Sequence, residues 1–496
     1  MNREERTPIR NLPSGVPGLD TVLGGGLPEY SFNLIAGAPG SGKTILAHQI
    51  MFANATVERP ALYFTLLGEP TLKMLRYQRQ FGFFDPNLAG SAIKFINLSA
   101  EVMERNLADV LQQIVNEIES AKPGIVVVDS FRTIGGRDGR LARGESFDLD
   151  QFVQHLALHL TTWEVTSFLL GDYSEADQRN PVFTVADGIL WLSQVRDRNS
   201  IVRKLQVVKT RGRAQMPGLH TFRIADHGLQ VFPRIPEQTL NRVPKKRERL
   251  STGVPGLDEM MGGGVIGGDL VMFNGPAGSG KSTIAMQFMA AGLAKGETGV
   301  VAVFDEYPEE YLARANQRNP EIGKMVENGR LELVYLRPLD LTVDETLAAI
   351  LEAVKRLGTT RVVIDSMSGF EIVLAPAFRE DFRESLYRLV GTLTATGVTV
   401  FMTAEASETF SQLQFSAEKV SFITDEVVVQ RYVELNGELR RVMAVIKMRG
   451  SDHSREFRLY EISDKGVIVG DPLTEYERII TGVPTLRAKP SRARGK

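Results

Sequence analysis

A phosphate-binding loop occurs twice in this chain. The two copies read Gly37-Ala38-Pro39-Gly40-Ser41-Gly42-Lys43-Thr44 and Gly275-Pro276-Ala277-Gly278-Ser279-Gly280-Lys281-Ser282. They are separated by 238 residues, since 281 − 43 = 238. The same offset joins residues 15–20 to residues 253–258, and residues 209–212 to residues 447–450. The chain is therefore a tandem duplication of one nucleotide-binding domain, and its function depends on how the two sites differ.

The composition is that of an ordinary globular protein. Of the 496 residues, 43% are hydrophobic and 24% are charged, and the net charge is −2. We predict a first ATP-binding domain over residues 1–240, a second over 241–485 and a basic disordered tail over 486–496. The absence of cysteine excludes disulfides and fits the cytoplasm. No apolar run is long enough to predict a membrane span, and the neutral balance argues against a nucleic-acid partner.

Each half alternates short apolar runs with amphipathic stretches, which is typical of a parallel sheet covered by helices. The predicted fold class is α/β, with two tandem P-loop NTPase domains, each a mostly parallel sheet flanked by helices. Strands are predicted over residues 32–36, 61–65, 125–128, 167–170 and 205–208, and over 270–274, 300–304, 361–364, 398–403 and 442–446. Helices are predicted over residues 283–295 and 343–357.

The loop glycines permit backbone angles that direct successive N–H groups at a bound polyanion. Lys43 and Lys281 are expected to reach the β- and γ-phosphates of ATP, and the hydroxyls of Thr44 and Ser282 to bind Mg²⁺. A chance glycine-rich turn is the alternative. Two matches in one register, each between a predicted strand and a predicted helix, favour nucleotide binding.

An aspartate ends a buried strand in each half, at Asp129 and at Asp365. A carboxylate in that place suits the Mg²⁺ that accompanies the phosphates. A strand-end aspartate is also a common turn former. Its occurrence in both halves favours the metal-binding interpretation.

The halves differ where hydrolysis would need a proton acceptor. In the second half, a predicted strand runs into Asp305 and Glu306, which are our candidates for the general base. In the first half, Leu67 and Gly68 stand at the equivalent positions, and Glu69 follows one or two places late. We therefore expect the first site to bind nucleotide but to hydrolyse it weakly, unless Glu69 or a carboxylate from elsewhere reaches the site.

These residues resemble the RecA-like ATPases of the KaiC family. The resemblance rests on residues 251–258 and 262–264 before the second loop, and on the segments 423–425, 432–434, 447–450, 462–466 and 477–482. It implies two RecA-like domains and a homohexamer of two stacked rings, with ATP between neighbouring subunits. It also implies that Lys209 and Arg211, like Lys447 and Arg449, reach the phosphates of the adjacent subunit.

The same resemblance implies autokinase activity. Asp305 and Glu306 match an acidic pair whose first member is glutamate in the family, so the base here is one methylene shorter. The family phosphorylates a neighbouring Ser and Thr, which correspond to Ser421 and Phe422. Only one acceptor hydroxyl remains, with Ser416 as a secondary candidate. The alternative for Ser421 is a plain polar residue near a subunit interface.

Our leading hypothesis is a ring-forming ATPase whose second domain is also a serine/threonine protein autokinase, used in signalling or circadian-like timing. Its expected cofactors are ATP and Mg²⁺, and its expected partners are further copies of itself and signalling proteins. A DNA recombination or repair ATPase of the RadA type is the first alternative. A non-catalytic scaffold stabilised by nucleotide is the second.

Overall fold

The computed structural model describes residues 10–66, 71–99, 107–129, 149–174, 182–197, 200–234, 243–244, 247–336, 341–374, 382–406, 423–479 and 484–487. Two compact units divide the chain, Met1–Ile235 and Pro236–Lys496.

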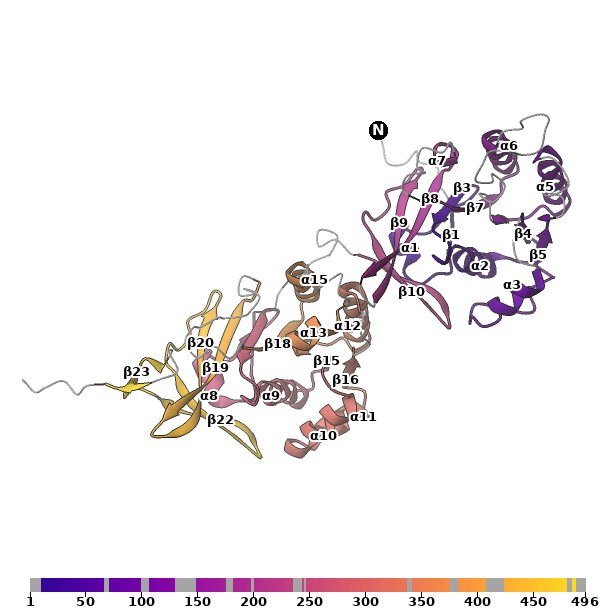
Figure 1. Ribbon diagram of the computed structural model, residues 1–496. Coiled ribbons are helices and arrows are strands. Elements are labelled where there is room, and N and C mark those ends of the chain that lie inside the picture. The colour runs from indigo at the N-terminus through magenta and orange to yellow at the C-terminus, as the bar shows by residue number, and fades with distance from the viewer. Residues whose placement is uncertain are drawn as a thin grey trace, which may run out of the picture. The chain divides into compact units, whose positions relative to one another are not determined.

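The first unit is built on a nine-stranded sheet with the order β11-β10-β9-β8-β3-β7-β6-β4-β5 (Figure 1). Its strands are β3 (Phe32–Gly37), β4 (Ala61–Thr65), β5 (Ile93–Asn97), β6 (Ile125–Asp129), β7 (Thr166–Asp172), β8 (Gly188–Asp197), β9 (Ser200–Thr210), β10 (His220–Ala225) and β11 (Gly228–Phe232). The pairings from β8 to β5 are parallel, and those from β8 to β11 are antiparallel. A parallel core is thus extended by an antiparallel wing.

Helices cover both faces of this sheet because alternate residues of a strand point to opposite sides. Leu34 of β3 packs into a core with α5 (Leu107–Ala121), α6 (Leu149–Thr162) and α7 (Val182–Val185). Ile35 packs into the other core. That second core is formed with α1 (Leu19–Val22), α2 (Lys43–Asn54) and α3 (Thr71–Gln78). Before β3 in the sequence, β1 (Asn11–Leu12) and β2 (Leu27–Pro28) pair as a short antiparallel ribbon.

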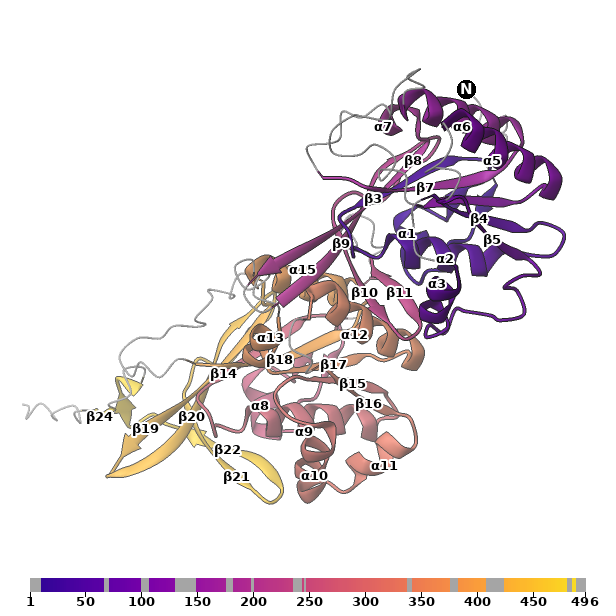
Figure 2. The ribbon, with the colours of Figure 1, turned by 45° about the vertical axis from the view of Figure 1, so that its right-hand side comes forward.

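The second unit repeats this order, β22-β21-β20-β19-β14-β18-β17-β15-β16. Its main strands are β14 (Leu270–Gly275), β15 (Gly299–Val303), β16 (Leu331–Tyr335), β17 (Arg361–Asp365), β18 (Thr399–Glu405), β19 (Glu426–Leu435), β20 (Glu438–Met448), β21 (Arg458–Ser463) and β22 (Gly466–Pro472). Two short ribbons join β12 (Arg249–Leu250) to β13 (Val265–Ile266) and β23 (Tyr476–Glu477) to β24 (Thr485–Leu486). Figure 2 shows the antiparallel wing of β19–β22 beside the helix-covered part of this sheet.

The same alternation builds the second unit. Met272 of β14 packs with α12 (Val343–Leu357), α13 (Met367–Val373) and α15 (Phe382–Ala395), whereas Phe273 packs into the core of the opposite face. That opposite face is covered by α8 (Pro255–Met260), α9 (Lys281–Ala294), α10 (Pro308–Arg318) and α11 (Glu321–Glu327). Within the described residues, no helix is both long and apolar enough to cross a bilayer.

The predicted fold class is confirmed: both units are α/β domains of the RecA-like P-loop type. Every predicted strand coincides with an observed one to within a residue or two at its ends, except that β9 and β20 are longer than predicted. The prediction that the strand includes Phe304 is wrong, because β15 ends at Val303. Phe304 is still buried at the point where the chain turns. The edge strands β5 and β16 and most of each antiparallel wing were not predicted.

Candidate functional site

Each phosphate-binding loop connects the central strand of its sheet to the helix that follows. The first loop connects β3 to α2, and the second connects β14 to α9. Gly42 and Gly280 immediately precede the helices, with φ of 105° and 91°, which L side chains rarely adopt. The loops therefore turn directly into helix N-termini, whose unpaired N–H groups and positive dipole ends favour an anion.

The loop lysines fold back over their own loops. Lys43 Nζ donates to the carbonyl oxygens of Gly37 and Ala38, and Lys281 Nζ donates to those of Gly275 (2.8 Å) and Pro276 (2.9 Å). Burial lowers the pKa of the Lys281 ammonium, while the nearby carboxylates of Glu405 and Asp365 oppose the shift. Phosphate oxygens are the ligands that would suit both ammonium groups better than neutral carbonyls.

In the first unit, Asp129 lies beside the loop at the carboxyl end of β6. Its Oδ2 accepts a hydrogen bond from Thr44 Oγ1 at 3.1 Å and another from the hydroxyl of Tyr63 on β4. Burial raises the pKa of Asp129, and the two hydroxyl donors and Lys43 oppose the shift. The strand-end aspartate and the loop hydroxyl thus meet at one point.

In the second unit, Asp365 at the end of β17 is held by two other hydroxyl groups. Tyr311 donates to Oδ2 at 3.0 Å, and Thr403 of β18 donates to Oδ1 at 2.6 Å. The tyrosine comes from helix α10 here, whereas Tyr63 comes from a strand in the first unit. No sequence pattern indicated either tyrosine, because the two do not share a register and each meets its aspartate only through the fold.

These oxygen atoms fit the Mg²⁺ that accompanies a nucleotide. Hydroxyl and carboxylate oxygens are ligands that Mg²⁺ prefers, and few protein ligands are needed because the ion keeps several waters. Thr44 and Asp129 are within hydrogen-bonding distance of each other, so one small cation could contact both. Ser282 and Asp365 are the corresponding pair in the second half.

The acidic pair lies between β15 and α10. Val303, the last residue of β15, is paired with Asp365, the last residue of β17. Asp305 follows Val303 by two residues, so it lies just past Asp365 at the carboxyl ends of these strands. Asp305 Oδ2 accepts a hydrogen bond of 2.7 Å from Ser366, a contact that the sequence did not indicate. The Glu306 carboxylate pairs with Arg314 of α10; partial burial raises the pKa of Glu306, and this arginine opposes the shift.

The predicted trans-acting cations lie far from the loop of their own domain. Lys209 on β9 is paired with Ile189, which lies at the start of β8. β8 runs parallel to β3, so Lys209 lies near the end of the sheet at which β3 starts. Ile189 is level with Leu34 of β3, and the phosphate loop begins at Gly37, three residues or roughly 10 Å further along the strand. Arg211 forms a salt bridge of 2.9 Å with Asp187.

The second unit repeats this arrangement. Lys447 is opposite Val427, near the start of β14, and its Nζ donates to the carbonyl oxygen of Thr424 at 2.6 Å. Arg449 pairs with Asp425 at 3.4 Å. Desolvation lowers the pKa values of both Lys209 and Lys447, and the neighbouring arginines act in the same direction. Within one chain, the structure does not bring these cations to the loops.

Several predicted residues fall outside the described part of the chain. These are the candidate phosphoacceptors Ser416 and Ser421, and the first-half segment containing Leu67, Gly68 and Glu69. Their predictions therefore rest on the sequence.

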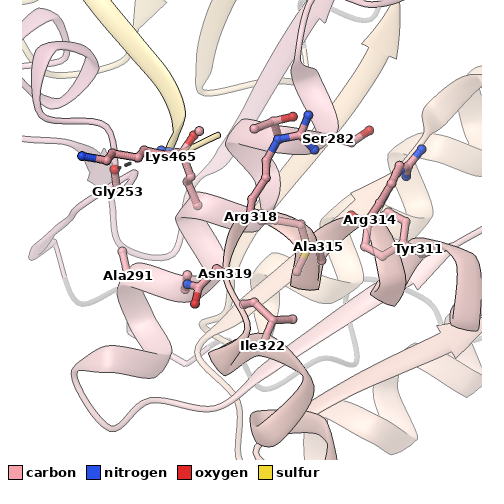
Figure 3. A pocket seen from close by; sticks show the side chains of 15 residues that line it. Gly253, Ser282, Ala291, Tyr311, Arg314, Ala315, Arg318, Asn319, Ile322 and Lys465 are labelled. Carbon is pink, nitrogen blue, oxygen red and sulfur yellow. Dashed lines mark hydrogen bonds between the residues drawn. The ribbon is translucent and has the colours of Figure 1, made fainter. Parts of the chain in front are cut away.

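A pocket of about 310 Å³ borders the end of the second phosphate loop (Figure 3). Ser282 and α9 form one wall, α10 forms another with Tyr311, Arg314 and Arg318, and Lys465 projects from the turn between β21 and β22. The pocket combines the aliphatic part of α9 with three cationic side chains. Because Tyr311 also binds Asp365, the pocket is connected to the candidate metal site through one side chain.

Comparison with known proteins identifies the same duplication. The model of a family described as "ATPase: KaiC" matches residues 12–235 and again residues 250–474. The circadian clock oscillator protein KaiC of Picosynechococcus sp. is 27% identical over 96% of this chain and 93% of its own length. The circadian clock protein KaiC3 of Synechocystis sp. is 26% identical over 99% and 97%, and KaiC of Synechococcus elongatus is 26% identical over 98% and 93%.

Proposed function

Because the chain belongs to the KaiC ATPase family, we propose that it forms a ring, binds nucleotide in both halves and hydrolyses ATP in the second half, and that it acts in signalling or circadian-like timing. The ATP-binding domains would be residues 1–240 and 241–485, in a cytoplasmic protein. One observation carries the assignment of the active half. A phosphate-loop lysine, a hydroxyl-bound aspartate and an acidic pair meet at the carboxyl edge of the second sheet.

Each group in this second site has a separate role in the proposed reaction. Lys281 would exchange its two carbonyl acceptors for β- and γ-phosphate oxygens. Ser282 and Asp365 would hold Mg²⁺, which neutralises charge on the phosphates. Tyr311 and Thr403 keep the Asp365 carboxylate in one orientation by binding different oxygens of it.

Asp305 is our candidate for the group that accepts a proton from the attacking oxygen. Its side chain is one methylene shorter than glutamate, so its position depends on the support it receives. Ser366 provides support by donating to Oδ2, while its own oxygen accepts from the N–H of Gly369. Glu306 is held by Arg314 and would add to the negative field that orients water and metal.

The four cations favour a site shared between copies. Lys209 and Lys447 start from the sheet edge opposite their own phosphate loops, at a separation that a lysine side chain does not span. A neighbouring subunit is therefore the place where they would meet a phosphate. A cation that arrives in trans stabilises the charge of the phosphoryl transition state and couples turnover to assembly.

We further propose that the pocket of Figure 3 receives the nucleoside part of the ATP. It begins at Ser282, directly after the lysine that would hold the phosphates. Its aliphatic wall on α9 can pack against the base, and the guanidinium plane of Arg318 can stack on it.

Separate replacement of the two loop lysines tests the assignment of the active half. Purified protein with Mg-ATP should release phosphate, Lys281→Ala should abolish most of this turnover, and Lys43→Ala should leave most of it. The opposite pattern would assign hydrolysis to the first half. Persistent rings with no turnover in the wild type would instead support the nucleotide-stabilised scaffold.

Mixing two inactive variants tests the shared site. Lys281→Ala lacks the loop lysine, and Arg449→Ala lacks the trans-acting cation. Mixed rings contain some interfaces in which both residues are intact, so mixing should restore a measurable fraction of the turnover. A mixture no more active than its components would show that the two residues do not serve one interfacial site.

Autophosphorylation is proposed for Ser421, with Ser416 as a secondary acceptor, on the family resemblance alone. Intact mass spectrometry after incubation with Mg-ATP should reveal the added mass of one phosphate. Ser421→Ala should lose it, and Ser416→Ala should keep it. An unchanged mass in the wild type would reject the autokinase activity while leaving the ATPase intact.

A further inference from the structure

The first phosphate loop already carries an anion on its lysine. Asp172 ends β7, and the backbone register pairs it with Gly37, the first residue of the loop. Its Oδ1 forms a salt bridge of 2.7 Å with Lys43 Nζ. The lysine side chain is 8% exposed and the aspartate side chain 35% exposed, so the ion pair is only partly screened by water.

The second half lacks this contact at the same register. Glu405 ends β18 and is paired with Gly275, just as Asp172 is paired with Gly37. Glu405 is exposed, and no salt bridge joins it to Lys281, although the structure describes both residues. The Glu405 carboxylate acts on Lys281 only from a distance, where it opposes the lowering of the lysine pKa. The two halves therefore differ in whether the loop lysine is held in a direct salt bridge.

We propose that Asp172 occupies the place of a γ-phosphate oxygen, so that the first site selects nucleoside diphosphate over nucleoside triphosphate. This inference rests on the proposed nucleotide binding of the first half and names its preferred ligand. A diphosphate can bind the loop amides and share Lys43 while the ion pair stays in place. The γ-phosphate of a triphosphate must compete with Asp172 for the Lys43 ammonium group. Either the γ-phosphate or the Asp172 carboxylate is then left without its cation.

A second carboxylate that the structure describes near the first site acts in the same direction. Asp172 adds its negative potential to that of Asp129, the second carboxylate at this sheet edge. Lys43 is the loop cation that faces them. Like charges a few ångströms apart at a protein surface repel by more than about 1.4 kcal/mol, which is tenfold in affinity. The first half would thus retain ADP, as a stable partner to an active second half.

Binding to the full-length chain with Lys281→Ala isolates the first site. ADP and the non-hydrolysable β,γ-imido analogue of ATP compete for it against a fluorescent nucleotide in the presence of Mg²⁺. We expect ADP to bind at least about tenfold more tightly than the analogue. Adding Asp172→Asn should reduce this ratio to about threefold or less, mainly by tightening triphosphate binding.

Two controls match the charge change. Asp226→Asn removes an exposed carboxylate from the turn between β10 and β11 and should leave the ratio unchanged. Glu405→Gln, measured in a Lys43→Ala chain, changes the same register position of the second site and should have little effect there. Tryptophan fluorescence reports the folding of the first half, because both tryptophans, Trp163 and Trp191, lie in it.

The outcomes are distinguishable. Equal or tighter binding of the triphosphate by the parent, or a ratio that Asp172→Asn leaves unchanged, overturns the proposed selectivity. Failure of either nucleotide to bind the parent overturns nucleotide binding by the first half itself. Should Asp172→Asn misfold, Asp172→Ser supplies the same test.

Discussion

Glu426 is a buried carboxyl group at the start of β19. Its Oε1 accepts a hydrogen bond of 2.8 Å from the N–H of Ile266, and Oε2 has no hydrogen-bond partner among the described residues. Burial raises the pKa of Glu426 to about 8, and the negative charges of Asp269 and Asp425 add to the shift. The Ile266 N–H and Arg249 oppose it without cancelling it.

This pKa makes the stability of the second unit depend on pH. Below about pH 4.5 the carboxyl group is protonated in the folded and the unfolded chain, and burial costs no charge. Between about pH 4.5 and pH 8 only the unfolded chain releases the proton, so the free energy of unfolding falls as pH rises, by about 1.4 kcal/mol per pH unit. pH 7 is 2.5 units above 4.5, so at pH 7 the ionisation of Glu426 in the unfolded chain has lowered the free energy of unfolding by about 3 kcal/mol relative to acidic pH.

Glu426→Gln keeps the shape of the neutral acid and removes the titration. The free energy of unfolding of the variant, relative to that of the wild type, should therefore rise by about 1.4 kcal/mol for each pH unit between pH 5 and pH 8. Urea unfolding of nucleotide-free protein at several pH values measures this difference. Circular dichroism follows both units, and tryptophan fluorescence follows the first unit alone, which should not change.

Glu434→Gln is the matched control for this experiment. Glu434 lies on the same strand but is exposed, so its replacement should give no pH-dependent difference. A constant difference between Glu426→Gln and the wild type across the pH range would refute the reasoning, because it would mean that Glu426 ionises at the same pH in both states.

Three further changes test contacts in the second unit. Arg361 is fully buried and forms a salt bridge with Glu297, so Arg361→Ala leaves that carboxylate without its partner. The variant should lower the free energy of unfolding of the second unit by about 3–5 kcal/mol in urea, and a decrease below about 1 kcal/mol would contradict this. Gly369→Ala brings a Cβ to 2.2 Å from Asp305 Oδ1, so turnover should fall at least about tenfold with ATP affinity retained, and unchanged turnover would remove Asp305 from the reaction. Tyr311→Phe should raise the Mg²⁺ concentration needed for half-maximal turnover several-fold, and an unaltered Mg²⁺ requirement would show that its hydroxyl does not support the metal site.

The fold was predictable from the sequence because its strongest signals are local and occur twice. A phosphate loop requires glycines at positive φ between a strand and a helix, and both Gly42 and Gly280 have that conformation. The central strands are nearly continuous apolar runs because helices cover both of their faces. Edge strands such as β5 and β16 are less apolar, with several partly exposed residues, and their pattern does not predict a strand for that reason.

The supporting contacts of the site were not predictable in this way. Tyr63 and Tyr311 bind equivalent aspartates from a strand and from a helix, so no common spacing exists to be read. Asp172 reaches Lys43 only because β7 lies between β3 and β6, and this strand order is a property of the whole sheet. Sequence patterns predicted which groups would touch the nucleotide, and the fold was needed to find the side chains that contact those groups.

Strand direction places the phosphate loop and the paired cations of each half at opposite ends of the strands. β8 runs parallel to β3, and β9 returns antiparallel to β8, so Lys209 comes back to the edge of the sheet where β3 begins. The phosphate loop leaves from the edge where β3 ends, and β14, β19 and β20 repeat the arrangement with Lys447. Each half therefore presents its loop on one edge and its paired cations on the other. In the proposed ring, the cations of one copy would meet the loop of the next in a head-to-tail contact, and a head-to-tail contact that closes gives a ring. Assembly and phosphate recognition would then depend on the same four cations, so that a subunit outside the ring lacks part of its own site.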